Sequence, residues 1–419
     1  MLLRDRHADQ GRADRLPARS PRDRGKTGRR FARISVSPRH GRRDQVGQPV
    51  LHRLLLRRLP RTARRRREGV RIRTGPAPTV TASGRLLRLP KAELHVHLDG
   101  SLRTATMIEL AAERAEQLPT DDPAQLYDYM VVNDARNLED YLERFHLTLA
   151  LMQDAEGIER IAYELGEDHA GENVRYLEAR FCPILNAQGG LEPHEALEAA
   201  LSGLQRAEAD FGIHTGVIVC ALRSLDASVS KQMADLAVAY ADRGVCAFDV
   251  AGAEAGNPVR DHLEALGAAE AADLPITIHA GEGFGASSIR QAVEDGGAGR
   301  IGHGTRLLED EALLAQVRDA GIALEVCITS NVQTRVAASH ADHPVRHYYD
   351  EGLTVCLCTD NRLMSGVTLT EEYEHAQHDL GFTWDDLVRV ARMGFESAYV
   401  PDEVKATLLA EFDRDVAGL

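Results

Sequence analysis

From residue 86 onward, short apolar segments alternate with longer segments that have a helical pattern, and this alternation limits the possible folds more than any other feature. Between the apolar segments, hydrophobic residues recur three and four positions apart, which is typical of amphipathic helices. Such alternation predicts a parallel sheet with right-handed crossovers. The candidate strands are eight: 93–98, 175–181, 214–221, 246–250, 276–280, 300–302, 323–328 and 354–358. Eight repeats favour an α/β fold of the closed (β/α)8 TIM-barrel type over an open sheet.

The connection after the first strand, residues 101–173, is too long for a single helix. Its apolar residues Leu138, Tyr141, Leu142, Phe145 and Leu149 follow a helical period. We therefore predict a helical insertion after strand 1 that covers the mouth of the barrel. After the last strand, Thr368 and Glu371 have the spacing of a capping box at the start of another helix.

Composition excludes two broad classes of protein. The chain has 419 residues, 43% of them hydrophobic, but no segment approaches the roughly 20 uncharged apolar residues that a membrane-spanning helix needs. We therefore expect no membrane association. The six cysteines form no CxxC pair, and most lie in apolar, strand-like segments. They are interpreted as buried free thiols, which predicts a cytoplasmic protein rather than a disulfide-bonded secreted one.

Charge divides the chain into two parts. Residues 1–78 contain 23 Arg, one Lys and six acidic residues, a net charge of +18, whereas the remainder carries a net charge of −32. Because binding to nucleic acid requires Lys and Arg on the binding surface, the acidic part argues against nucleic acid as the main partner. We expect a small molecule as the binding partner, and the sequence leaves the oligomeric state open.

The Arg-rich segment has no apolar periodicity, even at the run 64–67, and cannot bury enough surface to offset the entropy of ordering it. A nucleic-acid-binding arm and a targeting peptide are alternatives. The apolar run 54–56 is too short for a secretory signal, and the segment is poor in Ser for a transit peptide. We predict that residues 1–84 are a disordered extension without function, translated upstream of the true start, and that residues 85–419 form the barrel.

Polar residues suited to catalysis follow the predicted strands, at the barrel end where active sites form. His95 and His97 end the first strand, and because residues i and i+2 of a strand point to one face, both imidazoles can approach one metal ion. A His-x-His pair alone is equally compatible with a metal-free polar pair. His279 ends the fifth predicted strand, and His303 and Asp360 follow the sixth and eighth.

Together these residues are hard to assign to packing. Three His and one Asp can surround a Zn²⁺ ion and leave one position for water. A Glu and a further His remain for proton transfer. The sequence therefore predicts a metal site that has a position for water and groups for proton transfer beside it.

These segments resemble, in order and spacing, the motif set of the adenosine deaminase family, which belongs to the metal-dependent amidohydrolase superfamily. The motifs are PKAELHVHLDGSLR, FDVAGAE, ITIHAGEGFG, RIGHGTRL, EVCITSN and CTDN, and the resemblance covers about four-fifths of the chain, from Leu89 onward. It implies a zinc-containing (β/α)8 barrel that hydrolytically deaminates a 6-aminopurine. Our leading hypothesis is deamination of adenosine and 2′-deoxyadenosine to the inosine nucleosides and ammonia, with one Zn²⁺ per chain.

The resemblance also implies a role for each matching residue. Glu282 would protonate purine N1, and His303 would orient the zinc-bound water and act as base or electrostatic partner. The ligands and substrate contacts would be His95, His97, His279 and Asp360 for zinc, with Asp99 at the ribose and the amide of Gly252 at purine N3. Because attack at C6 pushes electrons onto N1, a neutral carboxylic acid is needed there, so we expect Glu282 to have a raised pKa.

The sequence departs from the common family pattern at Asn361, where many members have a second Asp. This position would donate a hydrogen bond to purine N7, and an amide NH₂ is already a donor. Asn361 is therefore compatible with that contact, although it leaves the choice among purines less certain. The alternative is that Asn361 is only a turn residue.

Other functions are less consistent with the residues. The chain lacks the H-x-E and P-C-x-x-C ligands of the nucleobase-editing deaminases. The fourth strand, 246–250, contains no Lys of the kind that bridges two metals in related hydrolases, which favours one metal. Deamination of another 6-aminopurine, such as aminodeoxyfutalosine or adenine, remains an alternative. A nucleoside-binding protein without turnover is disfavoured, because every candidate catalytic group is present.

Overall fold

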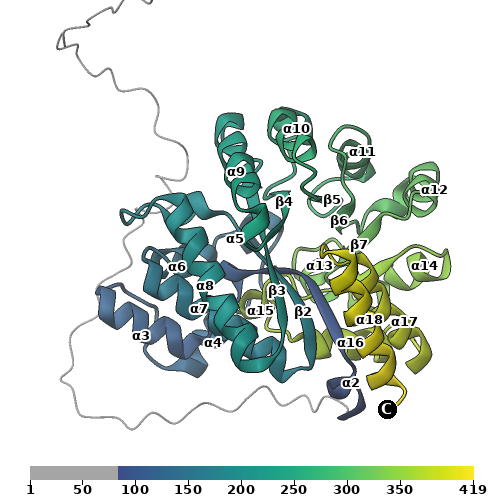
Figure 1. The fold of residues 1–419 in the computed structure, drawn as a ribbon, viewed down its shortest axis with the longest axis horizontal. Coiled ribbons are helices and arrows are strands. Elements are labelled where there is room, and N and C mark those ends of the chain that lie inside the picture. Colours follow the sequence, from purple (N-terminus) through teal and green to yellow (C-terminus); the bar gives the residue numbers. More distant parts are fainter. Residues whose placement is uncertain (1–83) are drawn as a thin grey trace, which may run out of the picture. The chain divides into compact units, whose positions relative to one another are not determined.

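The computed structural model describes residues 84–419, which form an eight-stranded barrel surrounded by helices (Figure 1). The strands pair in sequence order, and each pair is parallel. The strands are β1 (Lys91–His97), β2 (Val174–Phe181), β3 (His214–Leu222), β4 (Val245–Ala251), β5 (Ile276–Ala280), β6 (Arg300–His303), β7 (Ala323–Val326) and β8 (Val355–Leu357). The predicted (β/α)8 barrel is therefore confirmed.

Helices connect consecutive strands and pack around the barrel. Before β2 lie α2 (Gly84–Arg88), η1 (Leu98–Gly100), α3 (Thr104–Arg114), α4 (Pro123–Met130), α5 (Leu138–Leu142), α6 (Phe145–Leu151) and α7 (Ala155–Gly171). Between β2 and β6 lie η2 (Pro183–Asn186), α8 (Pro193–Phe211), α9 (Ala227–Ala239), η3 (Ala241–Arg243), η4 (Val259–His262), α10 (Leu263–Ala271) and α11 (Ala286–Glu294). After β6 follow η5 (Leu307–Glu309), α12 (Glu311–Asp319), α13 (Ile328–Gln333), η6 (His340–Asp342), α14 (Val345–Asp350), α15 (Arg362–Ser365), α16 (Leu369–His378), α17 (Trp384–Ser397) and α18 (Asp402–Val416).

The barrel closes between its first and last strands just beyond the end of β8. Val96 and Asp360 form a parallel bridge. The backbone amide of His97 donates to the carbonyl of Asp360 at 2.7 Å, and the amide of Asp360 donates to the carbonyl of His95 at 2.9 Å. Closure therefore places the residues after β8 directly beside the end of β1.

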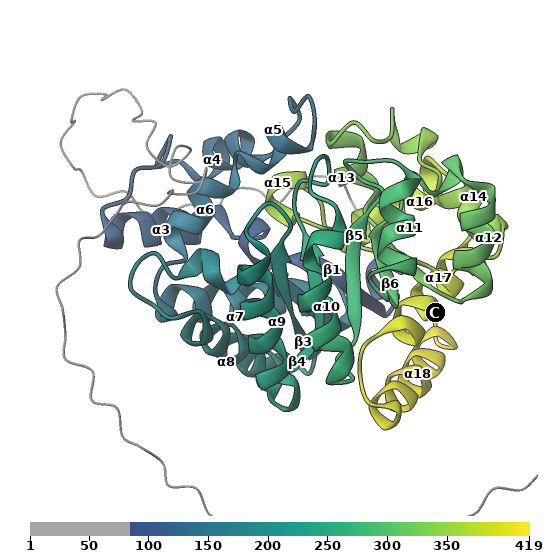
Figure 2. The same ribbon diagram turned by 90° about the horizontal axis from the view of Figure 1, so that it is seen from above.

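The insertion after β1 is helical, as predicted, and comprises α3 to α7. The segment after α4 lies against the loops at the carboxyl ends of the strands, where the amide of Val132 donates to the carbonyl of Met364 in α15 at 2.8 Å. Figure 2 shows α4, α5 and α15 at the same end of the barrel. The side chain of Tyr141 in α5 reaches Ser365 at 2.9 Å. The insertion therefore contributes buried side chains to the end of the barrel that carries the site.

The barrel interior contains an ion-paired layer as well as apolar side chains. Arg300 on β6 donates from Nε to Glu325 on β7 at 2.7 Å and pairs through its other nitrogens with Glu178 on β2. All three side chains are buried. Their opposite charges compensate one another, which is the condition under which charged groups persist in a protein interior.

Most sequence-based boundaries agree with the structure to within two residues. One differs in type, because the predicted seventh strand extended to Ile328, whereas β7 ends at Val326 and Ile328 begins α13. Thr368 and Glu371 form the expected capping box of α16. The six cysteines are free, and five are buried. Among residues 84–419, no helix combines the length and apolar character that a membrane span requires. The predicted disordered extension lies, apart from Gly84, outside the described residues.

Candidate active site

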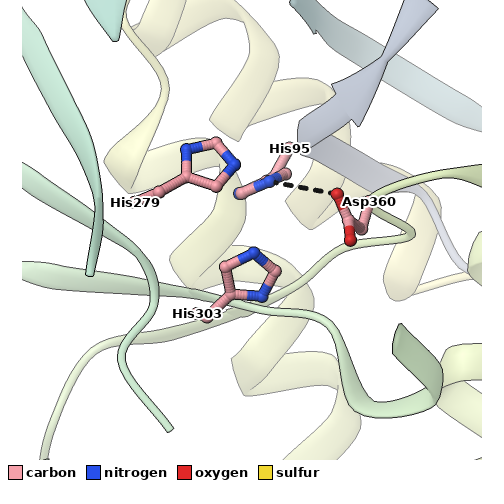
Figure 3. A group of neighbouring side chains, drawn as sticks. All are labelled: His95, His279, His303 and Asp360. Atoms are coloured by element: carbon pink, nitrogen blue, oxygen red, sulfur yellow. Dashed lines mark ion pairs between the residues drawn. The ribbon is translucent and has the colours of Figure 1, made fainter. Parts of the chain in front are cut away.

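The predicted site residues come together at the carboxyl ends of the strands. His95 and His97 lie in β1, His279 in β5 and His303 at the last position of β6, and Asp360 follows β8. Figure 3 shows His95, His279, His303 and Asp360 pointing toward a common centre. Four of the five residues are at most 5% exposed, and the side chain of His97 is 15% exposed. The barrel thus brings together five potential metal ligands, two from β1 and one each from β5, β6 and the segment after β8.

His303 and Asp360 have a backbone conformation that non-glycine residues rarely adopt. Their φ angles are +65° and +59°, in the left-handed region. Such a conformation costs on the order of 1–3 kcal/mol and persists only where the surrounding structure enforces it. In both residues this left-handed conformation occurs at the carboxyl end of a strand and directs the side chain toward the centre of the site. The strain is therefore associated with the placement of functional groups.

The donor atoms lie at distances suited to one metal ion. Nε2 of His97 is 3.2 Å from Nε2 of His279, and Oδ1 of Asp360 is 3.5 Å from Nε2 of both His95 and His97. Ligands about 2.0–2.2 Å from a tetrahedral ion are roughly 3.4 Å apart. The ligand atoms of His95, His279, His303 and Asp360 also lie within 4.8 Å of one another. The structure therefore offers five donors where the sequence predicted four.

Carboxylates behind the imidazoles orient two of them. Nδ1 of His95 contacts Oε2 of Glu325 at 2.9 Å, and Nδ1 of His279 contacts Oδ2 of Asp249 at 2.9 Å. Because a carboxylate accepts, each Nδ1 carries the proton and each Nε2 presents a lone pair to the centre. Arg180 donates to both carboxylates, to Glu325 at 2.8 Å and to Asp249 at 3.1 Å. This arrangement holds two imidazoles in the tautomer that binds metal.

The short helix α13 supports the opposite side of the site. Ser330 donates from its hydroxyl to Oδ2 of Asp360 at 2.6 Å, which leaves Oδ1 directed toward the imidazoles. The next residue, Asn331, contacts Nδ1 of His303 at 3.0 Å. The buried carboxylate of Glu372 accepts from the first two backbone amides of α13 at 3.1 and 3.0 Å. Glu372 thereby fixes the helix that carries both supporting side chains.

Glu282 lies in the turn after β5, beside His303. Its Oε2 atom is 3.6 Å from Nε2 of His303, and its Oε1 atom is buried without a hydrogen-bond partner. The carboxylate of Glu254 holds this turn by accepting from the backbone amides of Gly281, Glu282 and Gly283. Burial, with the charges of Asp360 and Glu254, raises the pKa of Glu282 well above its ordinary value. The expected upward shift is thus confirmed.

The predicted substrate-binding residues lie around the same end of the barrel. Asp99 lies in η1 and is 5% exposed, and burial raises its pKa to about 7. Gly252 follows β4 with a φ of +91°, a conformation that favours glycine. Asn361 is 3% exposed and packs on Gly100, where a Cβ atom would lie 1.9 Å from Oδ1 of Asn361. Only a glycine at position 100 leaves room for this side chain.

Sequence reasoning did not assign the supporting residues. Glu325 and Asp249 lie inside two of the quoted motifs and point inward on their strands, so an inward-facing acidic residue near a His ligand was an available signal. Glu254 was equally visible in the FDVAGAE motif. Tyr141 in α5 is 1% exposed, and its hydroxyl contacts Oγ of Ser365 at 2.9 Å. It carried no signal beyond its helical period, because its position depends on how the insertion folds over the barrel.

The geometry agrees with the comparisons to known proteins. A model of the adenosine deaminase family matches residues 90–415. The chain belongs to the adenosine deaminase family. Family membership also places it in the metal-dependent amidohydrolase superfamily, as the sequence motifs implied.

Named relatives cover the same part of the chain. An adenosine deaminase from Shewanella woodyi is 38% identical over 322 residues, which is 77% of this chain and 97% of the relative. A probable adenosine deaminase from Dictyostelium discoideum is 38% identical over 324 residues, also 77% of this chain but 42% of that longer protein. The family match therefore extends over nearly the full length of the bacterial relative.

Solved structures share the fold. The adenine deaminase from Arthrobacter aurescens superposes with a TM-score of 0.73 at 27% identity, covering 78% of this chain and 99% of that chain. An amidohydrolase from Burkholderia ambifaria with bound zinc superposes with a TM-score of 0.72 at 26% identity, covering 81% of this chain and 96% of that chain. Both similarities cover the barrel with its site.

Proposed function

We propose that the protein is a zinc-dependent deaminase that hydrolyses adenosine and 2′-deoxyadenosine to the corresponding inosine nucleosides and ammonia. One observation carries this proposal. Among residues 84–419, the buried polar atoms without a hydrogen-bond partner include one on each of four predicted site residues: Nε2 of His95, Oδ1 of Asp99, Oε1 of Glu282 and Oδ1 of Asn361. Leaving such a group unpaired costs about 1–3 kcal/mol, so their concentration at one place supports a polar ligand that pairs them.

His95, His97, His279 and Asp360 are the proposed zinc ligands. The donor spacing, the lone pairs of His95 and His279, and the free Oδ1 of Asp360 all fit one ion. The bound zinc of the Burkholderia ambifaria amidohydrolase supports the choice of metal. When bound, zinc supplies Lewis-acid activation of a water, whose pKa it lowers to about 7.

Glu282 is the proposed acid that protonates purine N1. Attack at C6 places negative charge on N1, and a protonated carboxyl beside N1 neutralises it. The raised pKa of Glu282 favours the protonated form, which is the form that can donate. Glu254 holds the turn at three backbone amides, so the acid stays in place. His303 lies within 3.6 Å of Glu282 and is proposed to orient the attacking oxygen.

Three further residues would bind the nucleoside. Asp99 is assigned to the ribose, the amide of Gly252 to purine N3 and Asn361 to purine N7. Asn361 is buried beside Tyr141, whose own hydroxyl contacts Ser365. This packing restrains the amide and supports a role in binding over a role in the turn alone. Because the helical insertion provides Tyr141, we assign the part of the pocket beside Asn361 to that insertion.

Adenine is the second candidate substrate, because a structural neighbour is an adenine deaminase. The deciding experiment is steady-state kinetics of the purified chain with adenosine, 2′-deoxyadenosine, adenine and aminodeoxyfutalosine, with metal content measured on the same sample. We expect the two nucleosides to have the highest kcat/KM and zinc to be present at one ion per chain. A higher kcat/KM for adenine or aminodeoxyfutalosine would replace the proposed substrate but keep the chemistry.

We further propose that residues 85–419 form the metal-dependent deaminase barrel and that residues 1–84 take no part in catalysis. We also assign the protein to the cytoplasm. All six thiols are free, and burial raises the pKa of Cys182 and Cys356 to about 12, which suits structural thiols in a reducing compartment.

A further inference from the structure

A buried chain of hydrogen bonds leads from a backbone amide to His303. The amide of Val345 donates to Nδ1 of His343 at 3.2 Å, and Nε2 of His343 contacts Oδ1 of Asn331 at 3.0 Å. Nδ2 of Asn331 contacts Nδ1 of His303 at 3.0 Å. The hydroxyl of Thr305 also donates to Oδ1 of Asn331, at 2.7 Å. We call these five residues the imidazole–amide chain.

The direction of hydrogen-bond donation along the imidazole–amide chain is fixed at its backbone end, the amide of Val345. A backbone N–H can only donate, so Nδ1 of His343 must accept and cannot carry a proton. Its single N–H is therefore on Nε2, directed at Asn331. Burial lowers the pKa of His343 to about 3, in agreement with a neutral imidazole.

The orientation of the Asn331 amide follows. Nε2–H of His343 needs an acceptor, and only the carbonyl oxygen of the amide can provide one. With the reverse orientation the NH₂ group would face the N–H of His343, two donors at 3.0 Å, and a buried donor would be left unpaired at both groups. The hydroxyl of Thr305 is satisfied by the same oxygen. The NH₂ group of Asn331 therefore points at His303.

We propose that Asn331, held by His343, is a positioning residue that keeps the proton of His303 on Nε2. Nδ1 of His303 then accepts from Asn331, and Nε2–H faces the site beside Glu282. In this tautomer His303 donates a hydrogen bond to the attacking oxygen and has no lone pair at Nε2 with which to remove its proton. The inference rests on the proposed function, and it chooses the orienting role of His303 over the role of base.

The same tautomer separates His303 from the other candidate ligands. Nε2 of His95 and of His279 carries a lone pair, because each Nδ1 donates to a carboxylate. Nε2 of His303 carries a proton, because its Nδ1 faces an amide donor. Of these three imidazoles, His303 is the one that cannot bind a cation through Nε2.

The test is the proton position itself. The full-length chain is labelled with ¹⁵N at both ring nitrogens of histidine, and two-bond ¹H–¹⁵N correlations distinguish protonated from unprotonated ring nitrogens. A spectrum of the His303→Gln variant assigns the His303 signals. We expect protonated Nε2 and unprotonated Nδ1 in the wild-type protein. Protonated Nδ1 on His303 in the wild-type spectrum would overturn the proposal.

Two substitutions test the cause. Asn331→Asp replaces the donor with an acceptor, so Nδ1 of His303 should gain a proton. Thr305→Val removes one of the two donors to Asn331 but leaves His343, so the His303 signals should remain those of the wild type. If Asn331→Asp leaves the proton of His303 on Nε2 alone, Asn331 does not set the tautomer.

Kinetics and metal content complete the experiment. We expect Asn331→Asp to lower kcat for adenosine about 10²–10³-fold, because a hydrogen bond used in the transition state is lost, with KM and zinc content little changed. If kcat is unchanged although the proton of His303 has moved to Nδ1, the hydrogen bond from Nε2 of His303 to the attacking oxygen does not have the role assigned to it. An enzyme with the expected tautomer but no turnover of any 6-aminopurine would instead reject the proposed function, so the two failures are distinguishable.

Discussion

A single buried carboxyl, that of Glu282, determines the chemistry we assign to the site. It is 5% exposed, and Asp360 and Glu254 are the charges that act on it most strongly. Burial and both negative charges favour its neutral form. The folded-state pKa is therefore raised, and the acidic form persists at a pH where an exposed Glu would be ionised. The same burial that costs folding free energy supplies the proton donor.

We expect Glu282→Gln to retain zinc and to lose about 10²–10⁴-fold in kcat for adenosine, because the amide keeps the shape of the side chain but has no acidic proton. The wild-type rate should fall as the pH rises through the raised pKa of Glu282, since only the protonated form acts, whereas the residual rate of the variant should lack this alkaline limb. Metal analysis and pH–rate profiles check both. A variant with near-normal kcat would place the acid elsewhere.

A substitution of His97 tests whether this residue belongs to the set of zinc ligands. Its Nε2 is 3.2 Å from that of His279 and 3.5 Å from Oδ1 of Asp360, although its ring is the most exposed of the four imidazoles. We expect His97→Ala to lose both zinc and activity, because a three-residue set binds the ion much more weakly. His378→Ala, on the exposed end of α16, serves as the control. Full zinc occupancy in dialysed His97→Ala protein would remove His97 from the ligand set.

At the scale of elements, α13 contributes more to the site than its six residues suggest. It carries Ser330 and Asn331, and it begins immediately after β7, so the strand end and the helix are placed together. Glu372 from α16 accepts from both backbone amides at its first turn. Burial raises the pKa of Glu372 to about 8. A helix this short has little stability of its own, so its position depends on this contact.

We expect Glu372→Gln to lower zinc affinity about 10–100-fold, the usual effect of disturbing groups that orient metal ligands, although Glu372 touches neither metal ligand nor substrate in the proposed site. The NH₂ group of the new side chain would face one of the two backbone amides and displace α13 with Ser330. Competition with a zinc chelator measures the affinity. Glu311→Gln, an exposed residue in the first turn of α12, is the matched control. Equal zinc affinities in Glu372→Gln and Glu311→Gln would contradict the role of Glu372 in holding α13.

The elements also show what could be predicted from the sequence. Strand periodicity and strand-end polar residues are local, so the barrel was predictable, and so was the gathering of His95, His97, His279 and Asp360 at the carboxyl ends of its strands. The role of these four residues as zinc ligands stays a prediction. The boundary at Ile328 was not, because its apolar neighbours continue the pattern of β7 while Glu372, 44 residues away, caps a helix there. The position of Tyr141 and the tautomer of His303 depend equally on contacts between distant segments. Such contacts leave no periodic signal in the sequence.

At the scale of the whole molecule, the described chain begins with α2, which packs as part of the barrel. Leu86 and Leu89 are 1% and 0% exposed, and the guanidinium of Arg85 lies 3.7 Å from the ring centroid of Trp384. These contacts place the functional boundary at α2 rather than at β1. The N-terminal boundary proposed above, at residue 85, therefore keeps the packed side chains of α2 within the barrel domain.

A shortened chain that begins at Gly84 should match the full chain in kcat/KM and in thermal unfolding temperature, because the Arg-rich segment has no apolar pattern that could contribute a core. A chain that begins at Lys91 should be destabilised, since burying a Leu side chain contributes about 1.5–3 kcal/mol and two are lost. Thermal denaturation and adenosine kinetics of the three proteins check this. A large loss of kcat/KM or of thermal stability in the chain that begins at Gly84 would mean that the preceding residues pack on the barrel.

The buried amine of Lys91 links the stability of the molecule to pH. It lies at the start of β1, is 0% exposed, and donates to the carbonyls of Leu86 and Leu89 at 2.9 and 2.8 Å. Burial lowers its pKa to about 7, from 10.5. Between these values the unfolded state binds the proton and the folded state releases it, so the contribution of Lys91 to the free energy of unfolding rises with pH from about 7 to about 10.

We expect Lys91→Met to remove this pH dependence. The free energy of unfolding of the wild type relative to the variant should increase as the pH rises from 7 to 9, because the wild type no longer has to bury a charge while the variant is indifferent to pH at this position. Denaturant unfolding at several pH values measures it. Lys405→Met is the control, because Lys405 also donates to a backbone carbonyl, that of Glu396 at 2.9 Å, but from an exposed position. If the difference in free energy of unfolding between the wild type and Lys91→Met stays constant from pH 7 to 9, the amine remains charged in the folded protein. In that case an ammonium group holds α2 to β1.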